Sequence, residues 1–198
     1  MARTIAKDHD AKRGQIVSCA AKIFAEQGFD RASMNQVARE VGISKANIYH
    51  YYGSKDAILY DLLDGYLQDL RDEICGKDDP DLPPETRLHQ AVARILLAYQ
   101  GADNEHKVQI GAMSALPEDQ QRVLRGYQRD MVTRMSDILA AVAPEVFAQD
   151  AARLRATTMS VFGMLNWYYM WNGGAGTQAR EDYARLVTDL TLNGLRGL

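Results

Sequence analysis

The sequence predicts an all-α protein with about nine helices. Apolar side chains recur every three to four residues along most of the 198-residue chain, which is the period of an amphipathic helix. No segment shows the alternation of apolar and polar residues that a half-buried strand would have. Residues 1–55 carry nine Lys and Arg against five Asp and Glu, whereas the remainder is acidic, so we expect two domains, residues 1–55 and 56–198.

Three helices are expected in the first domain, and the second of them is opened by Ser33 and closed by Gly42. Ser33 precedes the apolar residues Val37 and Ala38 and has Gln36 three residues on, which is the spacing of a capping box. Gly42 can adopt a positive φ without steric cost, as a sharp turn requires. The sequence therefore predicts a very short helix that ends in a tight turn. The helix before it is indicated by an apolar stripe through Ile16, Val17, Ala20, Ile23 and Phe24.

The third helix is opened by Ser44 and carries Ile48 and Tyr52, four residues apart, on its inner face. Helices this short are unstable alone and must pack against neighbours. Two of them joined by a tight turn are typical of a helix-turn-helix, whose second helix enters the major groove of DNA. Taken alone, the third helix could equally be an ordinary surface helix, but the apolar helices on both sides favour the helix-turn-helix.

Side chains that can contact DNA occupy the outward positions of these two helices. Asn can bond adenine through two hydrogen bonds, Lys can reach guanine, and Tyr and His can bond phosphate oxygens. Replacing Asn47 should relax base preference, whereas replacing Lys55 should weaken binding to every sequence. The expected DNA-binding residues are Ser33, Met34, Asn35, Lys45, Ala46, Asn47, Tyr49, His50, Tyr51 and Lys55.

The segment KIFAEQGFDRASMNQVAREVGISKANIYHYYGSKDAIL resembles the DNA-binding domain of the TetR family of bacterial transcriptional regulators. The resemblance covers roughly residues 12 to 63 and includes helix lengths, cap residues, the turn glycine and the aromatic cluster. It implies that Tyr49 and Lys55 contact phosphates and that residues 33–35 approach the DNA backbone. Tyr52 departs from the family pattern, which usually has phenylalanine, and we expect its extra hydroxyl to reach solvent or a phosphate.

The basic first domain fits a nucleic-acid partner, although the whole chain has a formal net charge of −3. Phosphate contacts dominate affinity for DNA, so a local excess of cations matters more than the total. Arg3, Lys7, Lys12 and Arg13 lie before the first apolar stripe. They form either a solvated, partly disordered tail or an arm from which Arg3 or Lys7 contacts the minor groove or a phosphate.

Six further helices are expected in the second domain. Their approximate ranges are Ser54–Cys75, Glu85–Gln100, Glu105–Ala115, Pro117–Val142, Ala151–Trp171 and Gln178–Leu195. Pro144 is expected to stop the longest of them. Asp78, Asp79 and Asp81 lie together before Glu85, where a solvated linker is favoured over a metal site. No metal ligand, cofactor or catalytic residue is predicted.

The last two helices are expected to pair two copies of the chain. One helix-turn-helix reads only a few base pairs, so specificity requires two copies spaced by about 34–36 Å or a multiple. Resemblance to the TetR family implies the same, through a four-helix interface. Core packing within one chain is the alternative and must account for some of these side chains. The expected interface residues are Leu154, Val161, Tyr183, Leu186, Val187 and Leu190.

The middle helices are expected to bind a small-molecule effector. Methionine and tyrosine side chains line adaptable cavities well, although a plain helical core is the alternative for each residue. A buried Asn166 would need hydrogen-bond partners, which a carbonyl or amide of a ligand could supply. The expected effector-binding residues are Tyr66, Leu70, Tyr99, Met113, Tyr127, Met131, Phe162, Leu165, Asn166 and Tyr169.

The segment GMLNWYYMW, residues 163–171, resembles the corresponding helix of TetR-family members that sense acyl-CoA thioesters and repress the degradation of fatty acids, steroids or aromatic acids. It implies a repressor that an acyl-CoA or aryl-acetyl-CoA thioester releases from a palindromic operator. Two rivals stay open: a TetR-like architectural or cell-division factor without a metabolite ligand, and an all-helical enzyme. The four histidines lack ligand spacing and no catalytic signature appears, which argues against the enzyme.

We expect the protein to be cytoplasmic. The N-terminus lacks the apolar core of a signal peptide. The longest nearly apolar run, residues 161–171, is too short to span a bilayer. Cys19 and Cys75 are expected to be free thiols in a reducing compartment rather than a disulfide.

Overall fold

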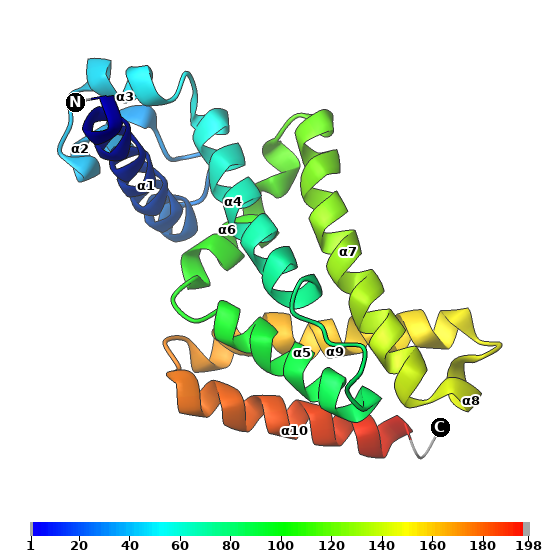
Figure 1. Cartoon of the computed structure of the whole chain (residues 1–198). Coiled ribbons are helices and arrows are strands. Elements are labelled where there is room, and N and C mark those ends of the chain that lie inside the picture. The colour runs from blue at the N-terminus through cyan, green and yellow to red at the C-terminus, as the bar shows by residue number, and fades with distance from the viewer. Residues whose placement is uncertain (1, 196–198) are drawn as a thin grey trace. The chain divides into compact units, whose positions relative to one another are not determined.

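The computed structural model describes the backbone of residues 2–195 and the side chains of residues 8–195, and all regular structure in this range is helical (Figure 1). Ten α-helices and one 3-10 helix are formed there. Their bounds are α1 Ala2–Gln27, α2 Met34–Val41, α3 Lys45–Tyr51, α4 Lys55–Cys75, α5 Pro84–Ala98, α6 Asp103–Ala112, η1 Met113–Ala115, α7 Glu118–Val142, α8 Pro144–Phe147, α9 Ala151–Asn172 and α10 Thr177–Leu195.

The predicted all-α fold is confirmed, with three differences in its helices. Helix α1 begins at Ala2, so the cationic segment is helical and not a disordered tail; the side chains of Arg3 and Lys7 lie outside the described residues. Pro144 does end α7, but it also begins the short helix α8, because the first turn of a helix does not use the N–H that proline lacks. Helix α6 stops at Ala112 and continues as η1.

The chain divides into two compact units. Unit 1 comprises Met1–Leu67 and Asn104–Leu124, and unit 2 comprises Gln68–Asp103 and Arg125–Leu198. Unit 1 thus contains the three predicted N-terminal helices together with most of α4, nearly all of α6, η1 and the start of α7. The domain boundary at residue 55 stays a prediction.

The core of unit 1 joins the helix-turn-helix to the start of α4. Helix α2 packs against both α1 and α3. Ile16 of α1, Val37 of α2 and Ile48 of α3 have no exposed surface, and neither have Ile58 and Leu59 of α4. Burial of side chains of this size contributes roughly 1.5–3 kcal/mol each, which is what holds helices of seven and eight residues in place.

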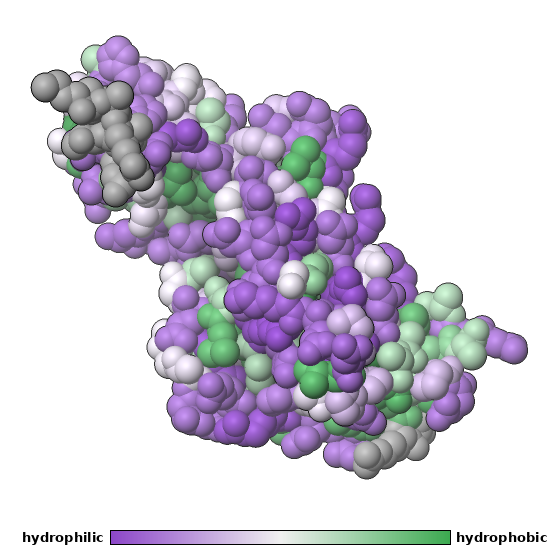
Figure 2. Space-filling model, in the orientation of Figure 1, coloured by the Kyte–Doolittle hydropathy of each residue, from purple (hydrophilic) through white to green (hydrophobic). Residues whose placement is uncertain are grey.

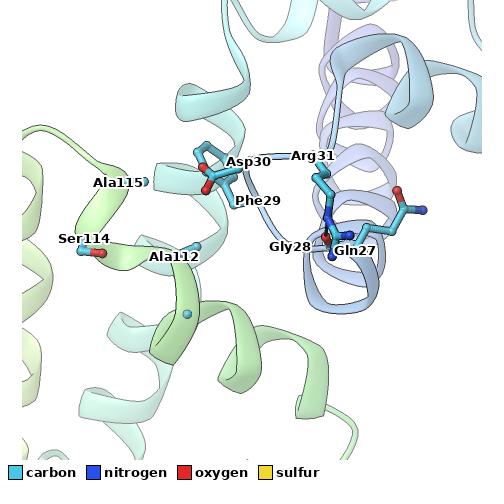
Figure 3. Close-up of a pocket in the computed structure, with 9 residues that line it drawn as sticks. Gln27, Gly28, Phe29, Asp30, Arg31, Ala112, Ser114 and Ala115 are labelled. Atoms are coloured by element: carbon cyan, nitrogen blue, oxygen red, sulfur yellow. Dashed lines mark hydrogen bonds between the residues drawn. The ribbon is translucent and has the colours of Figure 1, made fainter.

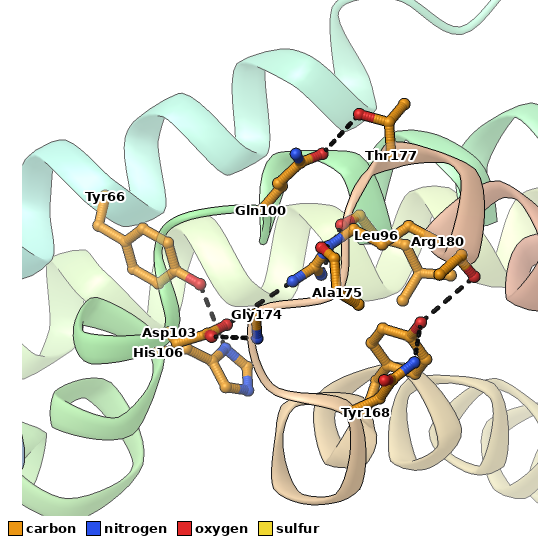
Figure 4. Close-up of polar contacts among 12 residues, drawn as sticks. Tyr66, Leu96, Gln100, Asp103, His106, Tyr168, Gly174, Ala175, Thr177 and Arg180 are labelled. Atoms are coloured by element: carbon orange, nitrogen blue, oxygen red, sulfur yellow. Dashed lines mark hydrogen bonds and ion pairs between the residues drawn. The ribbon is translucent and has the colours of Figure 1, made fainter.

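In unit 2, α10 packs along α5, and both contact α9. Arg180 of α10 is buried among them, with 1 % of its surface exposed. Its Nε and Nη1 donate to the carbonyls of Ala175 and Leu96, each at 3.0 Å, and its Nη2 lies 3.8 Å from a carboxylate oxygen of Asp103 (Figure 4). The backbone N–H of Gly174 donates to the same carboxylate at 3.3 Å. Arg180 therefore fixes the turn between α9 and α10 to the end of α5.

Most of the surface in Figure 2 is hydrophilic, with hydrophobic residues in small groups. Among the described residues, none of the helices combines the length and the apolar character that crossing a membrane would require.

Candidate nucleic-acid interface

The turn between α2 and α3 has the geometry that the sequence predicts. Gly42 follows α2 with φ of 75°, in the left-handed region that favours glycine. The Ser33 hydroxyl accepts from the backbone N–H of Gln36 at 3.3 Å, as an N-cap does. The reciprocal half of the expected capping box is not formed, and the Gln36 side chain instead donates through Nε2 to Gln27 of α1 at 2.7 Å. Helix α2 is therefore tied to α1 by the residue expected to cap it.

Helix α3 presents its polar side chains outward. The Ser44 hydroxyl caps it by accepting from the backbone N–H of Asn47 at 3.1 Å. Ile48 is its one fully buried residue, and Tyr52 at its C-terminal end is 4 % exposed. The opposite face is exposed and carries Lys45, Ala46, Asn47, Tyr49 and His50. This is the arrangement that a helix reading base edges needs.

The remaining predicted DNA-binding residues, in and next to α2 and α3, differ in how exposed their side chains are. Ser33 and Asn35 are exposed, but the Met34 side chain is buried, so its backbone alone is available to a phosphate. Tyr51 is half-buried and stacks on His9 of α1, with ring centroids 4.9 Å apart. His9 is a residue of this surface that sequence reasoning missed, because it lies 42 positions before its partner.

Lys55 at the start of α4 is engaged within the protein. Its ammonium donates to the carbonyls of Phe29, Asp30 and Ala32 at 2.6, 3.3 and 3.1 Å, and lies 4.2 Å from the centroid of the Phe29 ring. An ammonium has three protons, and three carbonyls accept from it here. Lys55 thus anchors the turn between α1 and α2, and phosphate contact by Lys55 stays a prediction.

The expectation that the Tyr52 hydroxyl reaches solvent or a phosphate is wrong. The hydroxyl donates to Oδ2 of Asp61 on α4 and accepts from Nε of Arg13 on α1 at 3.4 Å. Arg13 also donates to Asp61 at 2.8 Å. Burial raises the pKa of Tyr52 to about 12, and the hydrogen bonds that Arg13 donates to Tyr52 and Asp61 raise the pKa of Arg13. The hydroxyl turns inward because a carboxylate and a guanidinium satisfy it there.

A cavity of about 430 Å³ in unit 1 adjoins the loop that Lys55 anchors (Figure 3). One wall is the turn between α1 and α2, and the other is the end of α6 with η1. None of the predicted effector residues lines it. Its lining residues are Gln27, Gly28, Phe29, Asp30, Arg31, Gly111, Ala112, Ser114 and Ala115.

Comparison with known proteins finds a family match for each of two segments of the sequence. Residues 16–62 match the model of bacterial regulatory proteins of the tetR family. Residues 81–195, more than half of the chain, match the model of the tetracyclin repressor-like C-terminal domain. The chain belongs to the TetR family. As a member of this family of regulators, it is not an enzyme.

Three relatives of this TetR-family chain illustrate the range of similarity. A TetR-family transcriptional regulator from Bordetella parapertussis 12822 has a TM-score of 0.80 and 33% identity, covering 94% of this chain and 96% of that one. The HTH-type transcriptional regulator HbdR of Aromatoleum sp. (strain CIB) is 40% identical over 75 residues, 36% of this chain and 33% of HbdR, so the matched region spans a third of that relative. AibR, solved with isovaleryl coenzyme A and operator DNA, shares the fold, with a TM-score of 0.75 at 17% identity, covering 91% of this chain and 98% of that chain.

The residues expected to bind an effector fall in both units of this TetR chain. Tyr66 and Met113 lie in unit 1, where the Tyr66 hydroxyl is 3.2 Å from Nδ1 of His106, and the other eight lie in unit 2. Four of those are buried: Leu70, Met131, Phe162 and Leu165. The hydroxyl of Tyr99 donates to the Asn166 side chain at 2.7 Å, so the protein itself supplies a partner that was expected from a ligand. Tyr99 is half-buried, and desolvation of its hydroxyl raises its pKa above the usual range.

The residues expected at a dimer interface separate into three groups. Val161 and Val187 are buried within the chain, where they pack its own core. Leu154 and Tyr183 are half-buried, and the Tyr183 hydroxyl donates to the carbonyl of Met164 at 3.2 Å. Leu186 and Leu190 are 51% and 55% exposed. Four large apolar residues of α9 that the prediction omitted are similarly exposed: Met159, Trp167, Met170 and Trp171.

The acidic segment after α4 has a structural role. The buried carboxylate of Asp78 accepts from Arg87 at 3.0 and 2.6 Å and from Arg134 at 3.2 Å, which lowers its pKa and ties the linker to α5 and α7. Among the described residues, no group of three or more His, Cys, Asp or Glu side chains could hold a metal ion.

Proposed function

We propose that this chain is a transcriptional repressor that binds a palindromic operator as a homodimer and leaves it when a small molecule binds. The observation that carries the proposal is the exposed face of α3, whose opposite side is buried through Ile48 and Tyr52. A helix held in this way can enter a major groove with Lys45 and Asn47 directed at base edges. Relatives named as transcriptional regulators and repressors support it.

Operator reading is tested by replacing Asn47. A duplex selected by the protein from a random-sequence pool serves as the operator, and fluorescence anisotropy gives its affinity. Asn47→Ala should cost about 1–3 kcal/mol of binding free energy and relax base preference, because a bidentate contact to one base is lost. Asn104→Ala, which changes an exposed asparagine on α6, should leave the affinity and the base preference unchanged. Selection of no duplex above the random pool would refute operator binding.

The homodimer is supported by an exposed apolar face on α9 and α10. Large apolar side chains on α9 and the pair Leu186 and Leu190 on α10 face outward, and between the two helices lies a groove of about 330 Å³. Monomeric soluble proteins rarely expose large contiguous apolar patches. A second copy of the chain is the proposed occupant, since it would also supply the second reading helix that a palindrome requires.

An acyl-CoA or aryl-acetyl-CoA thioester is the proposed effector. The neighbouring structure of AibR contains isovaleryl coenzyme A, and residues 163–171 resemble the same helix in regulators of this kind. In unit 2, Tyr99 and Asn166 form a hydrogen-bonded polar pair, and small-molecule sites contain a few such polar groups that fix the orientation of the ligand. In the same unit, the exposed guanidinium of Arg129 is a candidate contact for the phosphates of a CoA group.

The effector proposal is tested by titrating the protein with CoA thioesters that differ in their acyl group. One thioester should raise the melting temperature, release heat in calorimetry and weaken operator binding by about 5- to 150-fold, the usual range of coupling between two sites. Free coenzyme A is the matched control. If no thioester produces heat or a melting shift, the effector is of another class. If operator binding resists every small molecule tried, the rival of a DNA-binding factor without a ligand is favoured.

A further inference from the structure

Helix α3 depends on its two ends for its orientation. It has seven residues, one of which is fully buried, and a helix of that length is unstable alone. Its N-terminal end is fixed by the Ser44 cap. Its C-terminal end is fixed at Tyr52. The backbone N–H of Tyr52 donates to the carbonyl of Ile48 at 3.0 Å, and its side chain is 4 % exposed.

Tyr52 connects this last end to two other helices through a network that we call the Tyr52 network, made of Arg13, Tyr52 and Asp61. The hydroxyl donates to Asp61 on α4 and accepts from Arg13 on α1, and Arg13 donates to Asp61. The guanidinium carbon of Arg13 also lies 5.4 Å from the centroid of the Tyr52 ring. Three helices of unit 1 therefore meet at one hydroxyl group.

The hydroxyl adds what a phenylalanine ring cannot supply. An apolar ring at position 52 would fill the same space, but packing alone restricts rotation and sliding of α3 weakly, because apolar contacts are not directional. A hydrogen bond to a carboxylate is directional and about twice as strong as one between neutral groups. In the Tyr52 network, Asp61 receives both of its bonds on Oδ2, so any displacement of Tyr52 also disturbs the Arg13 pair.

We propose that Tyr52 is a positioning residue for operator reading: through Asp61 and Arg13 it holds the exposed face of α3 in the orientation that binds DNA, without touching DNA itself. The inference rests on the proposed operator binding. It predicts that removal of one buried hydroxyl weakens operator affinity as much as removal of a direct contact.

The test compares Tyr52→Phe in two backgrounds, the natural chain and Asp61→Ala. In the natural chain, Tyr52→Phe should weaken binding to the selected duplex by about tenfold, the scale of one charge-assisted hydrogen bond. In the Asp61→Ala background, the same change should have a much smaller effect, because the charged acceptor is absent and only the 3.4 Å hydrogen bond from Arg13 to the hydroxyl remains. Asp61→Leu, which has a side chain of similar size but no acceptor oxygen, repeats the comparison should Asp61→Ala fold poorly.

Tyr49→Phe is the matched control, because Tyr49 lies on the same helix and is 47% exposed. Its effect on affinity should be the same in both backgrounds. Equal losses for Tyr52→Phe in the two backgrounds would overturn the inference, since that result would mean a hydroxyl acting on DNA directly. Unchanged affinity for Tyr52→Phe in the natural chain would overturn it as well.

A measurement without DNA separates this inference from the proposed function. Hydrogen exchange of the α3 backbone amides should be faster in Tyr52→Phe than in the natural chain, whereas amides of α9 in unit 2 should be unaffected. Failure of the natural chain to bind any selected duplex would refute the proposed function alone, and α3 exchange would then decide the positioning role. Unchanged α3 exchange would refute that role.

Discussion

At the scale of single residues, two positively charged side chains of unit 1 form internal contacts, and for one of them, Lys55, phosphate contact was expected. The Lys55 ammonium donates to three carbonyls, and the Arg13 guanidinium donates to Asp61 and Tyr52. Loss of affinity in Lys55→Ala would therefore not identify a phosphate contact by itself, because the same change releases the turn between α1 and α2. A phosphate contact can be assigned to a cationic side chain only after its hydrogen bonds within the protein have been taken into account.

Tyr52 also gives the protein a specific sensitivity to alkaline pH. Its pKa rises from 10.0 to about 12 because the ring is buried, so the folded state retains the proton that the unfolded state loses above pH 10. The stabilisation is fully present below pH 10 and is lost as the pH rises to 12, by about 2–3 kcal/mol of unfolding free energy. Denaturant unfolding at pH 9 and 11.5 should show a larger loss in the natural chain than in Tyr52→Phe, because Tyr99, whose pKa is also raised, contributes the same loss to both. Equal losses would contradict it.

At the scale of helices, most of the fold follows from local signals. Ser33, Ser44 and Gly42 act on neighbours within four residues, so the limits of α2 and α3 could be read from the sequence. The Tyr52 network could not, because Arg13 and Asp61 are 48 positions apart and meet only after α1 and α4 pack. The exposed face of α9 was also missed. Its apolar residues surround the helix, so periodicity does not select the side that stays open.

Removal of the Ser44 cap of α3 should lower operator affinity as well as the stability of the protein. Ser44→Ala removes the acceptor for the Asn47 backbone N–H and should cost about 0.5–2 kcal/mol of stability. Because the same turn carries the exposed Lys45 and Asn47, operator affinity should fall as well. Asp150→Ala removes a comparable cap from α9 and should lower the melting temperature without changing operator affinity. Thermal unfolding and anisotropy measure the two effects, and equal affinity losses in both variants would contradict this role.

At the scale of the whole molecule, charge and symmetry explain how an acidic chain can hold DNA. Although the net charge of the chain is −3, residues 1–55 contain nine cationic and five anionic side chains. Salt screens charges beyond about 8–10 Å, so acidic residues far from the reading helix oppose binding only weakly. A second copy would double the number of phosphate contacts and add a second half-site, which raises affinity steeply because the second contact is made within one complex.

Formation of the proposed dimer should therefore be separable from DNA reading by changes on α10 alone. Leu186 and Leu190 are one turn apart and 51% and 55% exposed, so Leu186→Asp with Leu190→Asp places two charges on the proposed interface without entering the core. Sedimentation should show a monomer, and affinity for the palindrome should fall by about 10²-fold or more while affinity for one half-site is unchanged. Ile110→Asp, at an equally exposed residue of α6, should leave a dimer. If the α10 variant stays dimeric, the apolar face of α9 and α10 is not what joins the two copies.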